Sequence, residues 1–227
     1  MALNKSNGNM YPGFKTWNPL AGECPHRCGY CSTNSLMRYP GVKSKYSGPL
    51  RLDEKAMKKT LGYDNMWFVC AQNDLFAEEA PFEIIREILF NCTRFPENSY
   101  FFQSKNPTKM IDHKAYFPKR SILCTTIESN RDYPDCNAPD MESRAYAMKH
   151  LRGFFSTTIT IEPIMDFDLN EFVDLLKFAN PDRINIGADS KNNHLPEPSK
   201  EKLLALIDEL KKFTVIDQKR NLSRLLK

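Results

Sequence analysis

The chain has 227 residues, of which 41% are hydrophobic and 26% are charged, a composition typical of a folded globular domain. No run approaches the ~20 consecutive apolar residues that a membrane-spanning helix requires. Residues 1–9 are polar and lack the apolar segment of a signal peptide. These features exclude a disordered chain and a membrane-spanning protein, and we expect a cytoplasmic protein.

The net charge of +4 is distributed unevenly along the chain. Residues 1–60 carry ten Lys or Arg side chains against three acidic ones, and residues 211–227 carry six against one. The segment between them is therefore acidic overall. Two basic ends favour an anionic small molecule or a nucleic acid as partner, although solvated helix faces explain each segment equally well.

Short apolar runs alternate with amphipathic helical patterns along the chain. Strands are predicted over residues 14–20, 66–71, 100–104, 121–127, 157–161 and 183–187. Helices are predicted over residues 81–91, 108–114, 141–150, 170–179 and 199–213, whereas residues 41–52 show no regular pattern. This alternation implies parallel βαβ units with functional residues at the carboxyl ends of the strands. The sequence thus predicts an α/β fold, either a partial (β/α)6 barrel or an open doubly wound sheet.

Three of the seven cysteines, Cys24, Cys28 and Cys31, form a C-x3-C-x2-C motif directly after the first predicted strand. Three thiolates on one short loop can converge on one metal centre, because sulfur is a soft ligand for iron–sulfur clusters and for zinc. A tetrahedral zinc site needs a fourth ligand, and His26 lies only two residues from both Cys24 and Cys28. The motif therefore favours a [4Fe–4S] cluster with one open iron, and a structural zinc site is the alternative.

This motif, in this place, resembles the cluster loop of the radical S-adenosylmethionine (SAM) superfamily. The resemblance implies a partial (β/α)6 barrel over residues 1–213, a [4Fe–4S] cluster on the three cysteines, and SAM chelated at the open iron. It also implies reductive cleavage of SAM to a 5′-deoxyadenosyl radical that abstracts hydrogen from the substrate, with an external electron donor such as flavodoxin or ferredoxin. Residues 214–227 are expected to form a basic tail that closes or flanks the barrel.

Short motifs after successive predicted strands extend this resemblance over residues 16–187. They are Trp17-Asn18-Pro19, Asn73-Asp74-Leu75-Phe76, Lys105-Asn106-Pro107, Ile127-Glu128 and Ile161-Glu162-Pro163. Together they resemble a small uncharacterised radical SAM family of phage and prokaryotic genomes that is distantly related to spore photoproduct lyase. Residues 71–74 replace the Gly-Gly-Glu of many superfamily members, so the motif does not identify the group that binds the SAM amino end.

Polar side chains at the predicted strand ends are candidates to bind SAM, which needs acceptors for its ammonium and ribose hydroxyl groups and a donor for its carboxylate. These candidates are Asn73, Asp74, Ser104, Lys105, Glu128 and Glu162, together with Tyr30, which the resemblance places near the adenine. A helix N-cap or a surface ion pair is the alternative for each carboxylate, and core packing is the alternative for Tyr30. Lys105 suits a substrate phosphate equally well. Cys124 is a candidate hydrogen-atom donor or an inert residue of the core.

Cationic and aromatic side chains mix in the segment after the cysteines, where Tyr39, Lys43, Lys45 and Tyr46 match a pattern used to bind nucleotides or single-stranded nucleic acid. This pattern and the resemblance favour a nucleobase, nucleotide or nucleic-acid substrate. Two alternatives stay open. One is a radical SAM enzyme that modifies a peptide or protein or activates another enzyme, and the other is a non-enzymatic, zinc-containing nucleic-acid-binding domain.

Overall fold

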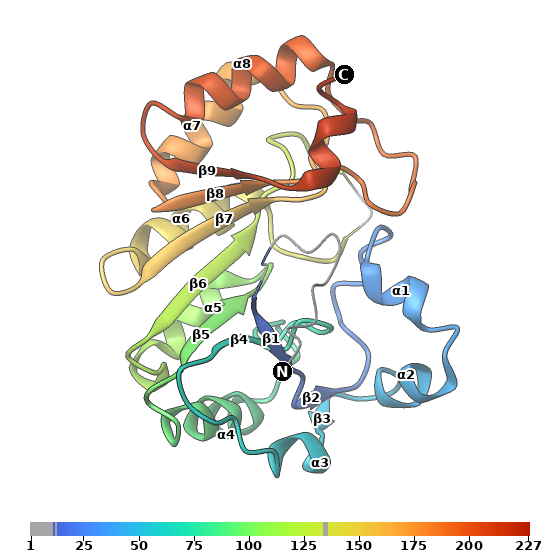
Figure 1. Ribbon diagram of the computed structural model, residues 1–227, viewed down its shortest axis with the longest axis vertical. Coiled ribbons are helices and arrows are strands. Elements are labelled where there is room, and N and C mark those ends of the chain that lie inside the picture. Colours follow the sequence, from blue (N-terminus) through green and yellow to red (C-terminus); the bar gives the residue numbers. More distant parts are fainter. Residues whose placement is uncertain (1–10, 12, 134–135) are drawn as a thin grey trace. The chain divides into compact units, whose positions relative to one another are not determined.

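The computed structural model describes residues 11, 13–133 and 136–227, which belong to two compact units (Figure 1). Of the described residues, the first unit, here called the cysteine-loop unit, comprises residues 14–122 and 136–138. The second, here called the C-terminal unit, comprises residues 11, 13, 123–133 and 139–227. No helix among the described residues is long and apolar enough to cross a membrane.

The described residues form an α/β fold with a seven-stranded main sheet. In spatial order its strands are β1 (Lys15–Trp17), β4 (Met66–Val69), β5 (Ser99–Gln103), β6 (Ser121–Thr126), β7 (Ser156–Ile161), β8 (Arg183–Ile186) and β9 (Val215–Gln218). The connections contain α4 (Phe82–Thr93), α5 (Pro107–Asp112), the 3-10 helix η1 (Lys114–Tyr116), α6 (Met141–Leu151), α7 (Leu169–Ala179) and α8 (Lys200–Leu210). This arrangement confirms the predicted alternation of strands and helices.

The cysteine-loop unit is built on β1, β4 and β5, which pair in parallel in that order. Strand β5 has three consecutive buried side chains, Tyr100, Phe101 and Phe102, as expected for a parallel strand covered on both faces. Helix α4 presents Ile85 and Ile88, both fully buried, at helical spacing. The apolar residues that predict these two elements are therefore buried in the folded unit.

A small second sheet interrupts the unit between β1 and β4. Its strands β2 (Leu20–Ala21) and β3 (Arg51–Leu52) pair antiparallel. Helices α1 (Ser32–Leu36) and α2 (Pro40–Lys45) lie on the excursion between these two strands, in blue in Figure 1. The cysteines lie on the first part of this excursion, directly after β2.

The prediction that residues 41–52 lack regular structure is wrong, because α2 and β3 fall within them. The guanidinium of Arg51 donates hydrogen bonds to the carbonyls of Ser44 and Lys45 at the end of α2, and such a contact leaves no local sequence pattern. Gly22 is required where the chain passes close to Pro49. Its φ is +104°, and a Cβ atom there would lie 2.4 Å from the Pro49 oxygen.

The C-terminal unit contains the parallel strands β7, β8 and β9. Fully buried isoleucines alternate along β7 at Ile159 and Ile161 and along β8 at Ile184 and Ile186. Helices α6, α7 and α8 pack in sequence, α7 against both neighbours. This unit therefore repeats the βαβ pattern that the sequence predicts for its part of the chain.

The last residues of the chain are structured. Residues 215–218 form β9, which adds a seventh strand to the six predicted, and η2 (Arg220–Arg224) follows it. Strand β9 escapes prediction because most of its side chains are exposed and it has no apolar pattern. These elements account for most of the segment that the sequence predicts to be a basic tail.

Asp53 joins α2 to the helix that follows β3, and its replacement tests how much this junction contributes to stability. Its carboxylate accepts a hydrogen bond from the Ala56 amide at the start of α3 (Glu54–Met57) and one from Lys45 Nζ at 2.5 Å. Burial by itself raises the pKa of the Asp53 carboxyl, but these hydrogen bonds outweigh it and hold the pKa below the usual value. Asp53→Ala is expected to lower the free energy of unfolding at pH 7 by about 1–2 kcal/mol.

The pH dependence of this loss follows from the lowered pKa. A carboxyl group with a lower pKa in the folded state stabilises the protein above its unfolded pKa of about 4, and this stabilisation is lost as the pH falls through the folded value. Urea denaturation of wild type and Asp53→Ala should therefore differ clearly at pH 7 and much less near pH ~2.5. Lys43→Ala, at an exposed lysine of α2, is the control. A difference that stays the same at acid pH would contradict the assignment.

Candidate functional site

The cysteine loop, residues 22–31, follows β2 and ends where α1 begins. Two tight turns shape it, with the Arg27 amide donating to the Cys24 carbonyl at 3.3 Å and the Cys31 amide donating to the Cys28 carbonyl at 3.1 Å. Arg27 adopts a left-handed conformation with φ of 47°. The Asn34 side chain donates to the Cys28 carbonyl at 3.2 Å and ties the loop to α1. The loop is thus a fixed element, although it contains no regular structure of its own.

Three sulfur atoms on one loop are a donor set that fits an iron–sulfur cluster. Cys28 is buried, and Cys24 and Cys31 are half-buried. Burial, followed by the negative charge of Asp74, raises the pKa of the Cys24 thiol to about 12, so its thiolate requires a bound cation at neutral pH. Among the described residues, no three His, Cys, Asp or Glu side chains converge closely enough to hold one metal ion. Thiolates that bind different irons of a cluster need not converge on a single point.

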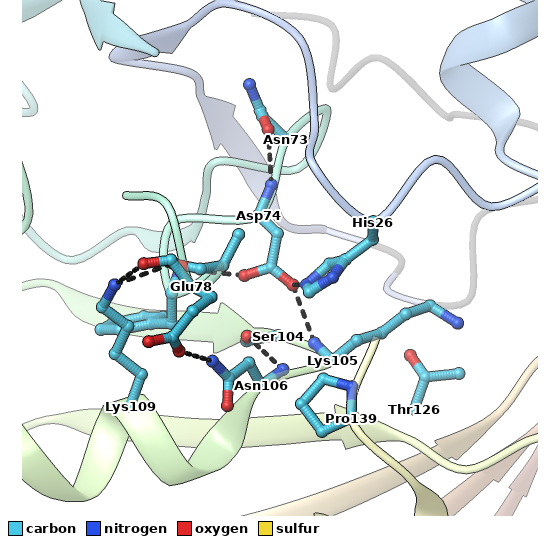
Figure 2. Close-up of polar contacts among 12 residues, drawn as sticks. His26, Asn73, Asp74, Glu78, Ser104, Lys105, Asn106, Lys109, Thr126 and Pro139 are labelled. Carbon is cyan, nitrogen blue, oxygen red and sulfur yellow. Dashed lines mark hydrogen bonds and ion pairs between the residues drawn. The ribbon is translucent and has the colours of Figure 1, made fainter. Parts of the chain in front are cut away.

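His26, inside the cysteine loop, is clamped to the residue that follows β4. Its Nε2 lies 2.9 Å from Asp74 Oδ2, and both side chains are buried (Figure 2). Burial alone would raise the pKa of the Asp74 carboxyl, but the hydrogen bond and charge of His26 hold the pKa below its usual value. Burial would lower the pKa of the His26 imidazole, and Asp74 instead raises it. Both shifts favour a charged pair, which anchors the loop between Cys24 and Cys28.

The remaining contacts of Asp74 and Asn73 are also structural. Asp74 accepts hydrogen bonds from the backbone amides of Phe76 at 2.9 Å and Lys105 at 2.8 Å. The Asn73 side chain donates to the Gly22 carbonyl at 2.8 Å and accepts from the Asp74 amide. Two of the predicted SAM-binding residues thus hold the cysteine loop. The sequence contains no signal for this clamp, because Asp74 lies 48 residues away from His26.

Tyr30 and Lys105 lie together beside the cysteine loop. The Lys105 ammonium group donates to the Tyr30 hydroxyl and lies 4.8 Å from the centre of the Tyr30 ring. Ser104, buried before Lys105, accepts a hydrogen bond from the Asn106 amide at 2.8 Å (Figure 2). The structure therefore brings five predicted site residues, Tyr30, Asn73, Asp74, Ser104 and Lys105, into one unit with the three cysteines.

Glu128, in the C-terminal unit, has a buried basic partner. Arg144 Nη1 donates to Glu128 Oε2 at 3.1 Å and to the Thr126 carbonyl at 2.9 Å, and Arg144 Nε donates to the Pro139 carbonyl at 2.7 Å. The side chains of the pair are only 6% and 7% exposed. Arg144 is thus the buried partner of a predicted site residue. The sequence did not reveal it, because Arg144 looks like any other cationic residue of a helix.

Glu162, also in the C-terminal unit, pairs with Lys219, which follows β9. The Glu162 side chain lies over Gly187, where an added Cβ atom would approach it to 2.9 Å. Ser190 contributes a further contact at 3.4 Å to the same carboxylate. The cation that pairs with Glu162 therefore comes from the segment predicted to be a tail.

Cys124 is part of a buried polar group in the C-terminal unit. Its Sγ lies 3.5 Å from Thr160 Oγ1, which in turn lies 2.7 Å from the Tyr11 hydroxyl. The Asn185 side chain donates to the same hydroxyl at 3.4 Å. Burial raises the pKa of the Cys124 thiol to about 12, so the group carries its hydrogen at neutral pH. Cys124 thus has polar neighbours, unlike a cysteine that only fills apolar space.

The four residues of the predicted cation–aromatic segment fall into two pairs, one engaged within the unit and one exposed. Lys45 pairs with Asp53, and Tyr46 is buried against it, with the ammonium group 5.5 Å from the ring. Tyr39 is exposed, and the Arg38 guanidinium lies 4.9 Å from its ring. Lys43 is also exposed. Only half of the predicted set is therefore available at the surface, together with Arg38.

Comparison with solved structures identifies the fold class of this chain. Neither a family model nor a curated protein matches the chain, but solved structures do. The fold is the partial barrel of the radical SAM type, as the sequence predicts. Several of the matching structures are of spore photoproduct lyase. A variant with bound AdoMet and dinucleoside spore photoproduct has a TM-score of 0.63 and 11% identity, covering 95% of this chain and 78% of that chain.

A second structure, spore photoproduct lyase complexed with dinucleoside spore photoproduct, has a TM-score of 0.60 at 11% identity with the same coverage. A third, of another variant of that enzyme, has a TM-score of 0.62 at 10% identity. These similarities confirm the predicted fold class and the resemblance to the superfamily at the level of the fold. The roles of the individual site residues stay predictions.

Proposed function

We propose that this chain is a radical SAM enzyme that acts on a nucleobase, a nucleotide or a nucleic acid. One observation carries the proposal: a loop with three cysteines follows β1 and β2 in a fold that is shared with spore photoproduct lyase over 95% of the chain. Cys24, Cys28 and Cys31 would hold a [4Fe–4S] cluster. The bound cluster and SAM would supply an organic radical that takes hydrogen from the substrate.

The protein contributes the position of the cysteine loop. Asp74 fixes the loop through His26, and Asn73 fixes it through the Gly22 carbonyl. A metal centre on the loop would therefore be supported by two buried contacts to the residues after β4. This support favours a fixed orientation of the three thiolates over a mobile one.

Tyr30 and Lys105 are our candidates for contacts with SAM. Tyr30 lies within the cysteine loop, and Lys105 brings a positive charge to its hydroxyl, where the SAM carboxylate or a substrate phosphate would find a donor. Ser104 lies next to Lys105 on the same strand end. Glu128 and Glu162 remain candidates with carboxylate acceptor capacity beyond their basic partners.

The substrate class is favoured by the dinucleoside bound in the spore photoproduct lyase structures. The exposed Arg38, Tyr39 and Lys43 add cations and an aromatic ring of the kind that binds nucleic acid. Cys124, a protonated thiol in a polar setting, is our candidate to return a hydrogen atom to the product. Its S–H hydrogen atom would move to the product radical and leave a sulfur-centred radical, which one electron from the external electron donor and one proton from solvent would convert back to the thiol.

Anaerobic reconstitution tests the proposed function. The purified protein is loaded with iron and sulfide, reduced with dithionite and supplied with SAM, and 5′-deoxyadenosine is measured. We expect a brown protein that releases 5′-deoxyadenosine, and faster release with the correct nucleoside, oligonucleotide or DNA than with peptides. A colourless protein that binds one zinc and does not bind SAM would overturn the proposal.

A further inference from the structure

A fourth cysteine lies beside the cysteine loop, on a segment that is remote in the sequence. Cys136, between β6 and α6, has its Sγ atom 2.7 Å from Cys28 Sγ. Both residues belong to the cysteine-loop unit, although they are 108 positions apart along the chain. Cys28 is buried and Cys136 is half-buried, so Cys136 is the more accessible of the two thiols.

Backbone hydrogen bonds hold the chain in place around both cysteines. The Cys28 carbonyl accepts a hydrogen bond from the Cys31 amide at 3.1 Å. Next to Cys136, the Asn137 amide donates a hydrogen bond to the His26 carbonyl at 2.8 Å. Two thiols that the fold has already brought together react with each other far more readily than two separate thiols in solution.

The distance between the two sulfur atoms distinguishes between two uses of such a pair. Two thiolates on one tetrahedral metal ion, each about 2.3 Å from it, lie about 3.8 Å apart, and thiolates on different irons of one cluster lie farther apart still. The S–S bond of a disulfide is about 2.05 Å long. At 2.7 Å the two sulfurs are too close to bind metal together, and they lie within about 0.7 Å of bonding distance.

We propose that Cys28 and Cys136 are a redox-sensitive pair: when the cysteine loop holds no metal, a peroxide joins them in a disulfide, and a dithiol separates them again. The disulfide is a covalent modification of a predicted cluster ligand, because only a thiolate binds iron and a sulfur in an S–S bond is no longer one. The cross-link itself does not depend on the proposed function, and only its effect on cluster loading rests on that function.

The reaction balances with hydrogen peroxide as the oxidant. Peroxide oxidises the accessible Cys136 thiolate to a sulfenic acid, and its O–O bond breaks with release of water. The Cys28 thiolate then attacks the Cys136 sulfur, the S–O bond breaks and a second water leaves. The two thiols have lost two electrons and two protons to the peroxide. A dithiol such as dithiothreitol reverses the change by thiol–disulfide exchange and is itself oxidised to a disulfide.

Gel mobility tests the cross-link in the full-length chain. Wild type, Cys136→Ser and the matched control Cys92→Ala, which removes a fully buried cysteine of α4, are freed of metal with a chelator and treated with peroxide. A link across 108 positions makes the unfolded chain more compact, so we expect a faster band on a non-reducing denaturing gel for wild type and control but not for Cys136→Ser. Dithiothreitol should restore the original band. An unchanged band in oxidised wild type would overturn the inference.

Peptide mapping identifies the bonded cysteines in the wild type, without any variant. Trypsin cleaves after Arg27, and we expect the peptide that begins at Cys28 to be joined to the peptide that contains Cys136. Fragmentation should place the bond on Cys28 and leave Cys31, on the same peptide, unmodified. Oxidised wild type in which Cys136 is unbonded, or bonded to Cys24 or Cys31 instead, would contradict the pairing.

A protection experiment separates this inference from the proposed function. Diamide, a diazene that takes two electrons and two protons from a pair of thiols, is added to metal-free and to anaerobically iron-loaded wild type. We expect the faster band only in the metal-free sample, because Cys28 binds iron in the other. Equal amounts of the faster band in both samples would overturn the exclusion of the cluster by the disulfide. A chain that takes up no iron and still forms the Cys28–Cys136 bond would end the proposed function and support the redox-sensitive pair. SAM cleavage by a chain that never forms this bond would do the reverse.

Discussion

Replacing Cys31 by alanine is expected to abolish both iron binding and SAM cleavage. Cys31 ends the cysteine loop directly before α1, whereas Cys28 has Cys136 beside it, with the two sulfur atoms 2.7 Å apart. Two remaining loop thiolates hold a cluster poorly, so we expect iron to fall below about a tenth of the wild-type content and 5′-deoxyadenosine release to fall by roughly 100-fold or more. Iron analysis and chromatography of the nucleoside product measure the two effects.

The control for this prediction is Cys92→Ala, which removes a fully buried cysteine from α4 and leaves the cysteine loop intact. It should bind iron and cleave SAM at close to wild-type levels. Full iron content together with product release in Cys31→Ala would contradict the assignment of the loop as the cluster site. Cys28→Ala is a weaker test, since Cys136 lies 2.7 Å from the sulfur that it removes.

Replacing Arg144 by methionine is expected to cause a large loss of stability. Arg144 neutralises Glu128 and satisfies the carbonyls of Thr126 and Pro139, and both charged side chains are almost completely buried. Breaking a buried ion pair leaves an uncompensated charge and costs about 3–5 kcal/mol. Urea denaturation at neutral pH measures this loss as a lower midpoint.

Two further variants test the cause of the loss. Arg183→Met breaks the pair with Asp217, in which both side chains are about half exposed, and should cost less than about 1 kcal/mol. Adding Glu128→Gln to Arg144→Met should recover part of the stability, because it removes the unpaired charge. A loss in Arg144→Met no greater than that of Arg183→Met would show that Glu128 is solvated or neutral without its partner.

Much of the fold follows from local sequence patterns. Helix α4 spans Phe82–Thr93, against a prediction of 81–91, because its apolar residues recur at helical spacing and are buried. Strand β9 was not predicted, since its exposed residues carry no such pattern and its position depends on pairing with β8. Helix α2 was missed for a similar reason, because the contacts of Arg51 that close its end come from outside the helix.

For the candidate site, too, the sequence predicts the residue types but not the contacts between them. The sequence identified Asp74, Glu128 and Glu162 as polar residues at strand ends, but it did not identify what each one binds. Their partners are brought close only by the fold, and two of these pairs, His26–Asp74 and Glu162–Lys219, are separated by 48 and 57 residues. A single sequence contains no signal for pairs at such separations. The sequence therefore predicted which polar residues stand at the strand ends, but not the contacts that they make.

The contact between Lys219 and Glu162 has a practical consequence for how the protein is produced. A chain shortened after residue 213 would lose β9, uncover the hydrogen-bonding edge of β8 and leave the Glu162 carboxylate without its cation. An uncovered edge strand is a template for intermolecular strand addition, so such a truncation should aggregate. Residues 214–227 should therefore be kept when the protein is shortened for crystallisation, and a purification tag is better placed at the other end of the chain.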